Sequence, residues 1–459
     1  MSGIVVAKFG GSLLRDGGGY ITLAGEVEKL LSGGRRVTVT VSAMKGVTDE
    51  LIEIVEKPVG WEPRLKRIME RYYSAARAAV TSEREATSLL GELSRLFDEL
   101  FKLVWAVKVI GEVTPHARAA IVSFGERLSA AVAAATLRSQ GIEAVWLDGR
   151  EAGIVAEGDP WEATVDYKLS ERLVRSKLLP LLEHRVVPVV TGFVAGTREG
   201  RTVLLGRGGS DYTATLLARF LGAEEVILYT DVPGVMSADP RRIPEARVIP
   251  RLSIAEAMEL ALLGAKRMHP KTFEPILDVD VTVRITMPGA EEATVVTREG
   301  GPPPLKAVVA TEGLAVVTVT GGGLVGRIGV ASKVTGIAAV NGVNILAIMQ
   351  PITETRISLV VRRDDAERLA RALEEGLRGL ISGVDVSEAS AVSVVGDGLR
   401  ESRVAGHLVE RAAALGGVES ILWAPGSPIL MALVRPGEEW ETARLLHAEV
   451  LERWGTGSP

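Results

Sequence analysis

The chain has 459 residues, of which 47% are hydrophobic and 24% are charged, and its formal net charge is −5. This composition is typical of globular proteins, and the length predicts about three domains of ~150 residues each. The mild negative charge argues against nucleic acid as a partner, because nucleic-acid binding needs a basic surface. No apolar run approaches the ~18–20 residues of a membrane span, and the first residues lack the layout of a leader peptide. We therefore expect a cytoplasmic protein with no membrane partner.

The sequence contains no cysteine and five histidines. Disulfides, thiolate nucleophiles and cysteine-ligated metals are thereby excluded, and no histidine pair has metal-ligand spacing, so no protein-bound metal is expected. Asparagine and glutamine are rare, with two of each. Depletion of these thermolabile residues is typical of thermophile proteins. Three of the four, Asn341, Asn344 and Gln350, fall close together and predict a site that needs neutral hydrogen-bonding groups, although Asn341 alone could cap a helix.

Strand and helix patterns alternate in the N-terminal half. The apolar stretch Ile4–Phe9 predicts a buried strand followed by the turn G-G-S, and a helix is predicted near Ile21–Leu31. Arg36–Ser42 predicts a second strand, followed by a turn and a helix from Thr48. Two strands separated by a helix fit a parallel βαβ unit.

The middle of this half is helical in period. Residues 61–112 predict a helical hairpin that covers one side of the sheet, and Ile121–Leu137 predicts an alanine-rich helix. Glu126 lies near the start of that helix, where a carboxylate either complements the helix dipole or contacts a ligand. Further strands are predicted at Ala144–Leu147, Val186–Gly192 and Val226–Tyr229. The alternation favours an α/β fold with a mostly parallel central sheet.

A glycine-rich turn stands out at Val203–Ala218, which reads V-L-L-G-R-G-G-S-D-Y-T-A-T-L-L-A. A strand that enters such a turn and then a helix directs backbone N–H groups and the positive end of the helix dipole at one spot, which suits an anion. Tight packing explains the glycines equally well. Ligands of parallel sheets bind at the carboxyl ends of the strands. The segments that directly follow predicted strands therefore share one rim: Gly10-Gly11-Ser12, Ser42, Phe193, Gly206–Asp211 and Thr230-Asp231.

The pattern changes after a Pro- and Gly-rich junction at residues 288–304. Beyond it, the order strand, helix, strand, strand, helix occurs twice, which predicts tandem ferredoxin-like modules of ~70–80 residues. These modules are poor in catalytic groups, so binding is their expected role. We expect a first domain at 1–287, a linker at 288–305 and modules at 306–385 and 386–459.

Six motifs resemble those of aspartokinases, in the same order. They are V-A-K-F-G-G-S (6–12), S-A-M-K-G-V-T-D (42–49), S-F-G-E-R-L-S (123–129), L-G-R-G-G-S-D-Y-T-A (205–214), Y-T-D-V-P-G-V (229–235) with A-D-P-R (238–241), and G-A-K-R-M-H-P (264–270). The resemblance covers essentially the whole chain. It implies a three-layer αβα amino-acid-kinase domain with a mainly parallel sheet, followed by two ferredoxin-like βαββαβ (ACT) modules.

The resemblance also implies a reaction, in which ATP and L-aspartate give ADP and 4-phospho-L-aspartate, the first step toward lysine, threonine and methionine. A carboxylate nucleophile with a pKa of ~4 is already ionised at neutral pH, so no general base is needed. The task of the protein is to bring two anions together and to neutralise charge on the transferred phosphoryl group. Mg²⁺ is expected to arrive with ATP, held largely by phosphates and water.

Residue roles follow from the same resemblance. Lys8 matches the lysine that reaches the transferring phosphate, and Asp211 matches the carboxylate that orients it. Glu126 matches the acid that holds the substrate ammonium, and Arg207 matches the group that pairs with the substrate α-carboxylate. The other expected substrate residues are Ser42, Thr48, Phe193 and Ser210.

The expected nucleotide residues are Lys8, Gly10, Gly11, Ser12, Thr230, Asp231, Met236, Asp239, Arg241 and Lys266. Two positions depart from the family pattern. Ser12, followed by two leucines, replaces the usual Thr, and Met236 stands where many relatives have an aromatic residue.

The C-terminal half is expected to be regulatory, because ACT pairs of this kind bind an amino acid at their mutual interface. The expected effector residues are Arg327, Ile328, Gly329, Val330, Asn341, Asn344 and Gln350. Gln350 favours threonine over lysine as the inhibitor, and ACT pairing predicts a homodimer or a higher oligomer.

Two alternatives stay open. The chain could be another amino acid kinase, of the acetylglutamate or aminoadipate type, although the tandem modules and S-F-G-E argue against it. It could also be a catalytically dead amino-acid sensor, against which the intact Lys8, Glu126, Arg207 and Asp211 argue.

Overall fold

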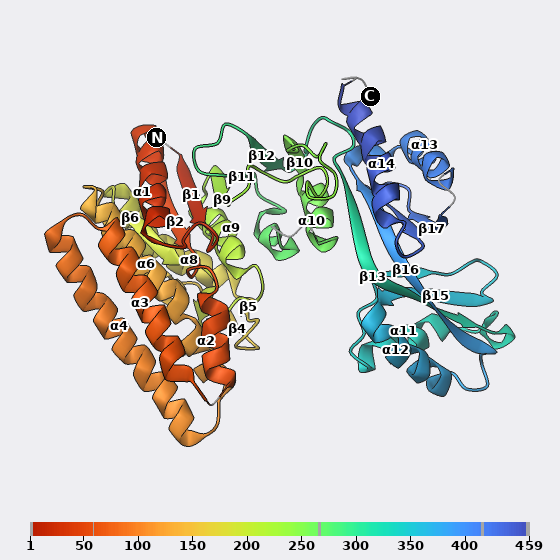
Figure 1. Cartoon of the computed structure of the whole chain (residues 1–459), viewed down its shortest axis with the longest axis horizontal. Coiled ribbons are helices and arrows are strands. Elements are labelled where there is room, and N and C mark those ends of the chain that lie inside the picture. The colour runs from red at the N-terminus through yellow and green to blue at the C-terminus, as the bar shows by residue number, and fades with distance from the viewer. Residues whose placement is uncertain (1–2, 58, 265–267, 415–416, 456–459) are drawn as a thin grey trace. The chain divides into compact units, whose positions relative to one another are not determined.

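A computed structural model describes the chain except for residues 1–2, 58, 265–267, 415–416 and 456–459 (Figure 1). The chain divides into two compact units. The first unit consists of Met1–Val235, Val248–Leu262 and Lys266–Gly301, and the second of Met236–Arg247, Leu263–Ala265 and Pro302–Pro459. Each unit has its own sheet and is described by itself.

The first unit is an α/β domain. Its helices are α1 (Gly17–Ser32), α2 (Val47–Glu56), α3 (Trp61–Ala79), α4 (Glu83–Ile110), α5 (Pro115–Val122), α6 (Phe124–Ser139), α7 (Gly149–Ala152), α8 (Tyr167–Glu183), α9 (Gly209–Leu221) and α10 (Ile254–Leu262). Its strands are β1 (Ile4–Phe9), β2 (Arg36–Val41), β3 (Ala144–Leu147), β4 (Ala156–Glu157), β5 (Thr164–Val165), β6 (Val187–Thr191), β7 (Val194–Gly196), β8 (Thr202–Leu204), β9 (Glu225–Tyr229), β10 (Arg251–Ser253), β11 (Thr282–Thr286) and β12 (Ala293–Thr297).

Eight of these strands form the central sheet, in the order β10-β12-β11-β9-β1-β2-β6-β3. Every neighbouring pair is parallel except β11 and β12. The mostly parallel sheet predicted from the alternation of strands and helices is thus confirmed. β1 lies between β9 and β2, with Lys8 in register with Leu228 and Thr40.

Successive side chains of β1 point to opposite faces of the central sheet, so the two faces of this strand contact different helices. Val5, Ala7 and Phe9 belong to the large hydrophobic core that contains α1, α3, α4 and α6. Successive side chains of a strand point to opposite faces, so Val6 and Lys8 point to the other face of the sheet. That face is where α9 contacts β1.

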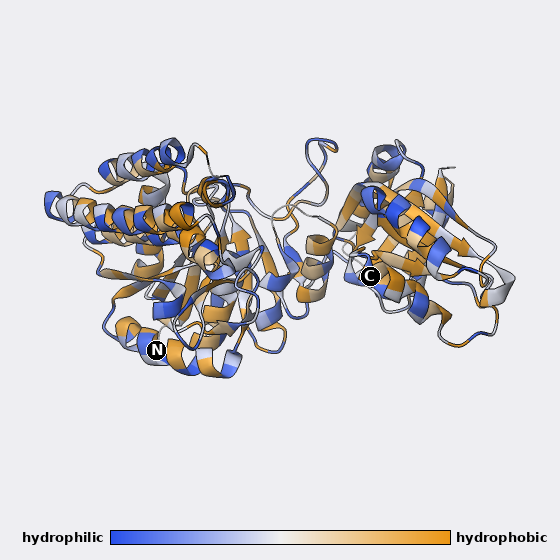
Figure 2. Cartoon of the chain, turned by 90° about the horizontal axis from the view of Figure 1, so that it is seen from below, coloured by the Kyte–Doolittle hydropathy of each residue, from blue (hydrophilic) through white to orange (hydrophobic). Residues whose placement is uncertain are grey.

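The predicted helical hairpin at 61–112 is formed by α3 and α4. The apolar stripes of these helices join the same core, and the helices contact α1 and α6 rather than covering the strands directly. Buried residues recur at helical spacing along both helices, as in amphipathic helices. Hydrophobic and hydrophilic residues occur together along the helices of the chain (Figure 2). The hairpin is therefore an outer layer over α1 and α6.

A single helix was predicted at Ile121–Leu137, and its predicted start is wrong, because a break at Ser123 separates α5 from α6. The helical stretch Pro115–Ser139 is also long and apolar enough to cross a membrane by length and composition, which corrects the expectation that no segment reaches that length. However, 89% of its apolar window is buried inside the protein. Burial of this kind is typical of the core helix of a globular fold.

The second unit contains the antiparallel sheet β14-β15-β13-β16-β18-β17. Its elements are β13 (Ala307–Thr320), α11 (Val330–Val340), β14 (Ala347–Met349), β15 (Arg356–Arg362), α12 (Arg363–Gly376), β16 (Gly383–Val395), α13 (Ser402–Ala413), β17 (Val418–Trp423), β18 (Ile429–Val434) and α14 (Glu439–Gly455). The predicted order of strand, helix, strand, strand, helix occurs twice. The two modules share one sheet because their first strands, β13 and β16, pair along most of their length.

Two glycines of the first unit allow a test of this packing. A Cβ on Gly149 would lie 1.8 Å from the backbone oxygen of Val194, whereas a Cβ on Gly91, which is exposed in α4, would meet nothing within 4 Å. We expect Gly149→Ala to lower the free energy of unfolding by about 2 kcal/mol or more. Gly91→Ala should raise it by about 0.5–1 kcal/mol, because alanine favours a helix interior. Urea unfolding measures both, and wild-type stability of Gly149→Ala would contradict this packing.

Candidate functional site

The carboxyl ends of β9, β1, β2 and β6 lie side by side and form one rim. The segments that follow these strands are joined by backbone hydrogen bonds. Gly10 N–H donates to Tyr229 O (3.3 Å), Ser42 N–H donates to Phe9 O (3.2 Å), and Gly192 N–H donates to Val41 O (2.8 Å). The predicted rim is therefore a continuous edge on which groups from distant parts of the chain meet.

An ion pair lies at the centre of this rim. Lys8 Nζ is 2.5 Å from Asp211 Oδ1, and their side chains are only 12% and 17% exposed. Lys8 reaches Asp211 because it points to the face of β1 that α9 contacts. Asp211 lies in the first turn of α9, where the helix dipole stabilises a carboxylate. A Cβ on Gly10 would lie 3.3 Å from Lys8 Nζ, so a small residue at position 10 leaves room beside the ammonium.

The glycine-rich turn before α9 has the backbone conformation that its sequence predicts. Gly206 and Gly208 have φ values of 77° and 74°, which residues with a Cβ rarely adopt. Gly208 is the N-cap of α9 and provides no side chain to cap the helix. The N-terminus of α9 is thus suited to an anion. Arg207 is exposed beside it and has no ion pair with any residue that the structure describes.

Glu126 is the most perturbed carboxylate of the rim. It is 3% exposed in the first turn of α6, and its Oε1 accepts a hydrogen bond from Ala43 N–H at 3.2 Å. Its Oε2 is buried without a partner among the described residues. Burial raises its pKa to about 8, against the opposing effect of the Ala43 N–H. A buried carboxylate with one unpaired oxygen is prepared to accept hydrogen bonds from a ligand.

Phe193 holds a strained conformation next to the glycine-rich turn. Its φ is +67°, which is uncommon for a residue with a bulky side chain. Its N–H donates to Thr213 Oγ1 in α9 at 3.0 Å. A Cβ on Gly209 would lie 2.7 Å from the Phe193 ring, so the ring packs on the start of α9. Strain of this kind persists where the surrounding structure fixes it, often at binding sites.

Ser210, Ser42 and Thr48 occupy the same edge. Ser210 packs on the end of β6, since a Cβ on Gly192 would lie 2.6 Å from its hydroxyl. Ser42 directly follows β2, and Thr48 lies in the first turn of α2. All three side chains are partly exposed. The predicted substrate residues of the first unit therefore lie along the rim or on the helices that begin there.

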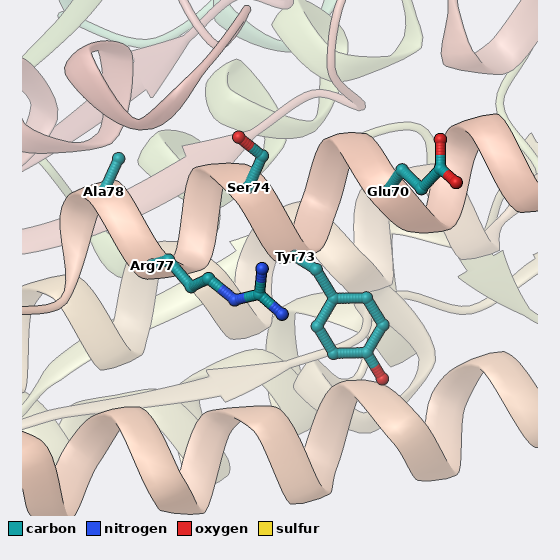
Figure 3. Close-up of a pocket in the computed structure, with 5 residues that line it drawn as sticks. All are labelled: Glu70, Tyr73, Ser74, Arg77 and Ala78. Atoms are coloured by element: carbon teal, nitrogen blue, oxygen red, sulfur yellow. The ribbon is translucent and has the colours of Figure 1, made fainter.

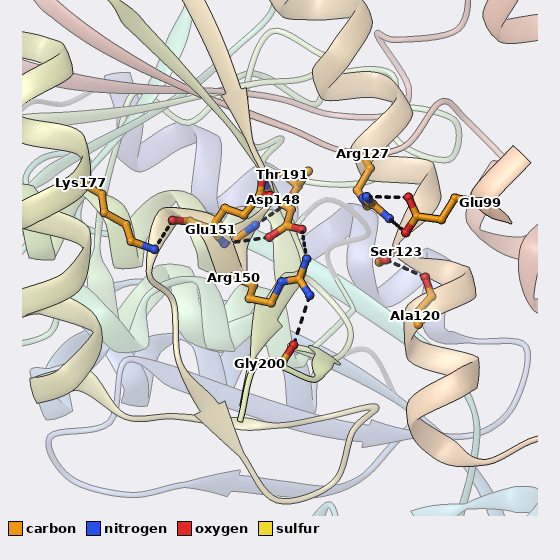
Figure 4. A network of polar contacts seen from close by, with 11 residues as sticks. Glu99, Ala120, Ser123, Arg127, Asp148, Arg150, Glu151, Lys177, Thr191 and Gly200 are labelled. Atoms are coloured by element: carbon orange, nitrogen blue, oxygen red, sulfur yellow. Dashed lines mark hydrogen bonds and ion pairs between the residues drawn. The ribbon is translucent and has the colours of Figure 1, made fainter. Parts of the chain in front are cut away.

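A polar network braces the rim beside β6 (Figure 4). Gly149 N–H donates to the hydroxyl of Thr191, the last residue of β6, at 2.8 Å. The buried carboxylate of Asp148 caps α7 through Glu151 N–H (2.8 Å) and contacts Arg150 at 3.1 Å. This network fixes the strand end that leads into Gly192 and Phe193.

The segment after β9 carries Thr230 and Asp231. Thr230 N–H donates to Thr286 O at 2.9 Å, and its hydroxyl donates to Asp231 Oδ1 at 3.3 Å. Arg15 Nη2 lies 3.5 Å from Asp231 Oδ2, and Arg15 Nε donates to Ser12 O at 2.7 Å. Arg15 links the G-G-S turn to this segment and is not among the residues predicted from the sequence. In the sequence, Arg15 is marked only by its position three residues after Ser12.

Three expected nucleotide residues belong to the second unit. They are Met236, Asp239 and Arg241, of which the last two pair with each other at 2.6 Å. The Met236–Arg247 segment is anchored within that unit, where Ser237 Oγ lies 2.8 Å from Nε2 of the buried His447. Lys266 lies outside the described residues.

The expected effector residues of the second unit surround the ends of α11. Arg327, Ile328 and Gly329 are exposed before α11, and Val330 is buried as its first residue. The Asn341 amide donates to Ile337 O at 2.8 Å and so caps α11, which explains this residue without a ligand. Asn344 and Gln350 are exposed on either side of β14.

Surface hollows are found away from the rim. One of about 570 Å³ is lined by Glu70, Tyr73, Ser74, Arg77 and Ala78 of α3 (Figure 3), and another of about 420 Å³ lies between α3 and α4. The charged side chains that line these hollows are all exposed, whereas Lys8, Asp211 and Glu126 are largely buried on the rim. The rim is therefore the better candidate for a reaction site.

Comparison with known proteins identifies the family. Residues 3–286 match the model of the amino acid kinase family, and residues 317–377 match the model of an ACT domain. The first match covers more than half of the chain. The chain therefore belongs to the amino acid kinase family.

Among individual relatives, lysine-sensitive aspartokinase 3 of Escherichia coli is 29% identical over 467 residues, which cover 98% of this chain and 100% of that protein. Bifunctional aspartokinase/homoserine dehydrogenases of Arabidopsis thaliana and Haemophilus influenzae are 27% and 29% identical over 83% and 96% of this chain. This chain spans only 43% and 56% of their lengths.

Two solved structures of E. coli aspartokinase III are similar over nearly the whole chain. The complex with lysine and aspartate (T-state) has a TM-score of 0.79 at 27% identity, with 97% of this chain and 99% of that chain covered. The complex with aspartate and ADP (R-state) has a TM-score of 0.80 at 26% identity, with 98% and 100% covered.

The perturbed pKa of Glu126 predicts a pH dependence of stability. Because the pKa in the folded protein (about 8) exceeds the ordinary value of 4.5, the folded protein retains a proton that the unfolded chain releases. Ionisation therefore opposes folding as the pH rises between these values. We expect the free energy of unfolding of the wild type to fall, relative to Glu126→Gln, from about pH 5 to about pH 8 and then to level off.

Urea unfolding across this pH range measures the effect, with Glu99→Gln as the control. Glu99 is half exposed and pairs with Arg127 at 3.2 Å, so its replacement should leave the pH dependence unchanged. Parallel curves for the wild type and Glu126→Gln would show that Glu126 is not perturbed.

Proposed function

We propose that this protein is an aspartate kinase, which uses ATP to phosphorylate the side-chain carboxylate of L-aspartate to 4-phospho-L-aspartate. The observation that carries the proposal is the largely buried Lys8–Asp211 pair at an uncapped helix N-terminus, on the same rim as Glu126. This arrangement can neutralise phosphate charge and hold an amino acid at one edge. Similarity to aspartokinases over nearly the whole chain supports it.

The proposed reaction balances without a proton transfer. A side-chain carboxylate oxygen of aspartate forms a bond to the γ-phosphorus of ATP, the bond from that phosphorus to the bridging oxygen breaks, and ADP leaves with the electron pair. The summed charge is the same on both sides. The residues therefore act by positioning two anions and stabilising charge, rather than as general bases.

The amino-acid side of the site uses two charged residues. The unpaired Oε2 of Glu126 accepts hydrogen bonds from the substrate ammonium, whose charge favours the ionised carboxylate. Arg207, exposed and without an ion pair to a described residue, forms a bidentate contact with the α-carboxylate. The remaining proposed contacts come from Ser42, Thr48, Phe193 and Ser210.

The nucleotide side uses Lys8 as the cation at the transferred phosphoryl group, held in place by Asp211. The other proposed contacts on the rim are Gly10, Gly11, Ser12, Thr230 and Asp231. Mg²⁺ would arrive with ATP, held by its phosphates and water, and would neutralise charge on the nucleotide.

The two ACT-type modules, at 306–385 and 386–459, are proposed to bind an amino-acid inhibitor and to form a homodimer or higher oligomer. Gln350 favours threonine as the inhibitor. One relative that this chain matches end to end, aspartokinase 3 of Escherichia coli, is lysine-sensitive, which makes lysine the competing candidate. We place the enzyme in the cytoplasm, at the first step toward lysine, threonine and methionine.

A coupled ADP-release assay tests the proposal. The substrates to compare are aspartate, glutamate, N-acetylglutamate and 2-aminoadipate, each with and without threonine or lysine. We expect turnover with aspartate alone and inhibition by threonine. Turnover with another acid would indicate another amino acid kinase, no turnover with any acid would favour a catalytically dead sensor, and inhibition by lysine alone would overturn the assignment of the effector.

The role of Asp211 gives a second prediction. If Asp211 orients Lys8, Asp211→Ala should lower kcat by about 100-fold or more and change KM for ATP far less, because the pair acts on developing charge. Asp278→Ala is the control, since Asp278 pairs with Arg219 on the surface. An effect confined to KM for ATP would refute the proposed role.

A further inference from the structure

The loop between β2 and α2, residues 42–46, is held on several sides. Ala43 N–H donates to Glu126 at 3.2 Å. A Cβ on Gly11 would lie 2.5 Å from Ala43 O, and a Cβ on Gly125 would lie 2.7 Å from Ala43 Cβ. The loop therefore passes between two glycines with little free space, and a small displacement of it would move the donor to Glu126.

A buried tyrosine of the outer helical layer anchors the same loop. Tyr72 lies in α3 and is completely buried. Its hydroxyl donates to Gly125 O at 2.8 Å and accepts from Met44 N–H at 3.2 Å. One oxygen atom thus joins the loop to the first turn of α6, one residue from each partner of the Ala43–Glu126 hydrogen bond.

The Tyr72 hydroxyl donates one hydrogen bond and accepts two. Ser129 Oγ lies 3.1 Å from the Tyr72 oxygen, and Tyr20 O–H donates to Ser129 Oγ at 3.1 Å. Because the Tyr72 proton goes to Gly125 O, the Ser129 hydroxyl is the donor toward Tyr72. Burial raises the pKa of Tyr20 and that of Tyr72, so both remain protonated donors. Loss of the Tyr72 hydroxyl would leave the buried Met44 N–H without its acceptor, which is unfavourable, and would remove the second hydrogen bond of Gly125 O.

A neighbouring residue of α3 provides a second anchor. Arg71 Nη2 donates to Lys45 O at 2.7 Å, and Arg71 Nη1 lies 3.2 Å from Glu50 in α2. Consecutive residues of α3 therefore hold the N–H of Met44 and the carbonyl of Lys45. Unlike Tyr72, Arg71 is partly exposed, so its replacement leaves the core intact.

We propose that Tyr72 is a positioning residue of the amino-acid site, whose hydroxyl fixes the 42–46 loop relative to Glu126 and so sets the affinity for aspartate. This inference rests on the proposed function. It gives the hairpin of α3 and α4 a role beyond that of an outer layer. Tyr72 does not touch the substrate and acts through Met44 and Gly125.

The test compares Tyr72→Phe with Tyr73→Phe, both assayed for ADP release. Tyr73 is the next residue of α3 (Figure 3). Its ring stacks on Phe97, which the Tyr72 ring also contacts. The Tyr73 hydroxyl has no hydrogen bond to a described residue. We expect Tyr72→Phe to raise KM for aspartate about tenfold, which corresponds to about 1.4 kcal/mol. KM for ATP should stay within about twofold, and Tyr73→Phe should match the wild type in both.

Two further measurements separate positioning from general destabilisation. Arg71→Met should raise KM for aspartate by a smaller factor, about threefold, without loss of folding. Hydrogen exchange at the amides of Ala43 and Met44 should be faster in Tyr72→Phe than in Tyr73→Phe, whatever the substrate. An unchanged KM for aspartate in Tyr72→Phe, equal increases in both KM values, or unchanged exchange would each overturn the inference.

Failure of the proposed function gives a different result. A wild-type protein without aspartate-dependent ADP release would refute that function and the substrate named here. Faster exchange at Ala43 and Met44 in Tyr72→Phe would then still show that the hydroxyl holds the loop against Glu126.

Discussion

The contact between Lys8 and Asp211 depends on a single geometric constraint, the two-residue period of a strand. Val5, Ala7 and Phe9 pack into the core with α1 and α6, so Lys8 points to the opposite face, where α9 begins. The glycine-rich turn places the first turn of α9 at the carboxyl edge of the sheet, and Asp211 lies 2.5 Å from the lysine. A shift of β1 by one residue would bury the ammonium in the apolar core and dismantle the rim.

Two other residues of the rim, Glu126 and Phe193, destabilise the folded protein. Glu126 has an unpaired buried oxygen and a pKa of about 8, and Phe193 holds a φ of +67°. Both features oppose folding in the free protein. A substrate ammonium would relieve the first, because it supplies the missing partner of the carboxylate. This is the physical reason to regard Glu126 as a binding group rather than as an acid that complements a helix dipole.

Much of this arrangement can be predicted from the sequence. The alternation of strands and helices predicts a parallel sheet, and the carboxyl ends of parallel strands lie together at one edge. The strand Ala144–Leu147 and the hairpin at 61–112 were predictable from local patterns. The break at Ser123 was not, since the apolar period continues through it. The hydrogen bonds of Tyr72 and Arg15 were not either, because they join residues that no local pattern relates. The placement of Met236–Arg247 in the second unit likewise depends on packing with segments more than 50 residues away.

In the proposed function, the Lys8–Asp211 pair supports transfer of a phosphoryl group to a side-chain carboxylate. Trapping of the acyl phosphate with hydroxylamine, in the presence of ATP and aspartate, tests it most directly. We expect wild-type protein to form the side-chain hydroxamate of aspartate in step with ADP. Lys8→Met keeps the length of the side chain but removes its charge, and should form the hydroxamate at least about 100-fold more slowly. Formation of ADP without hydroxamate, or equal rates for the wild type and Lys8→Met, would show that the pair does not support this transfer.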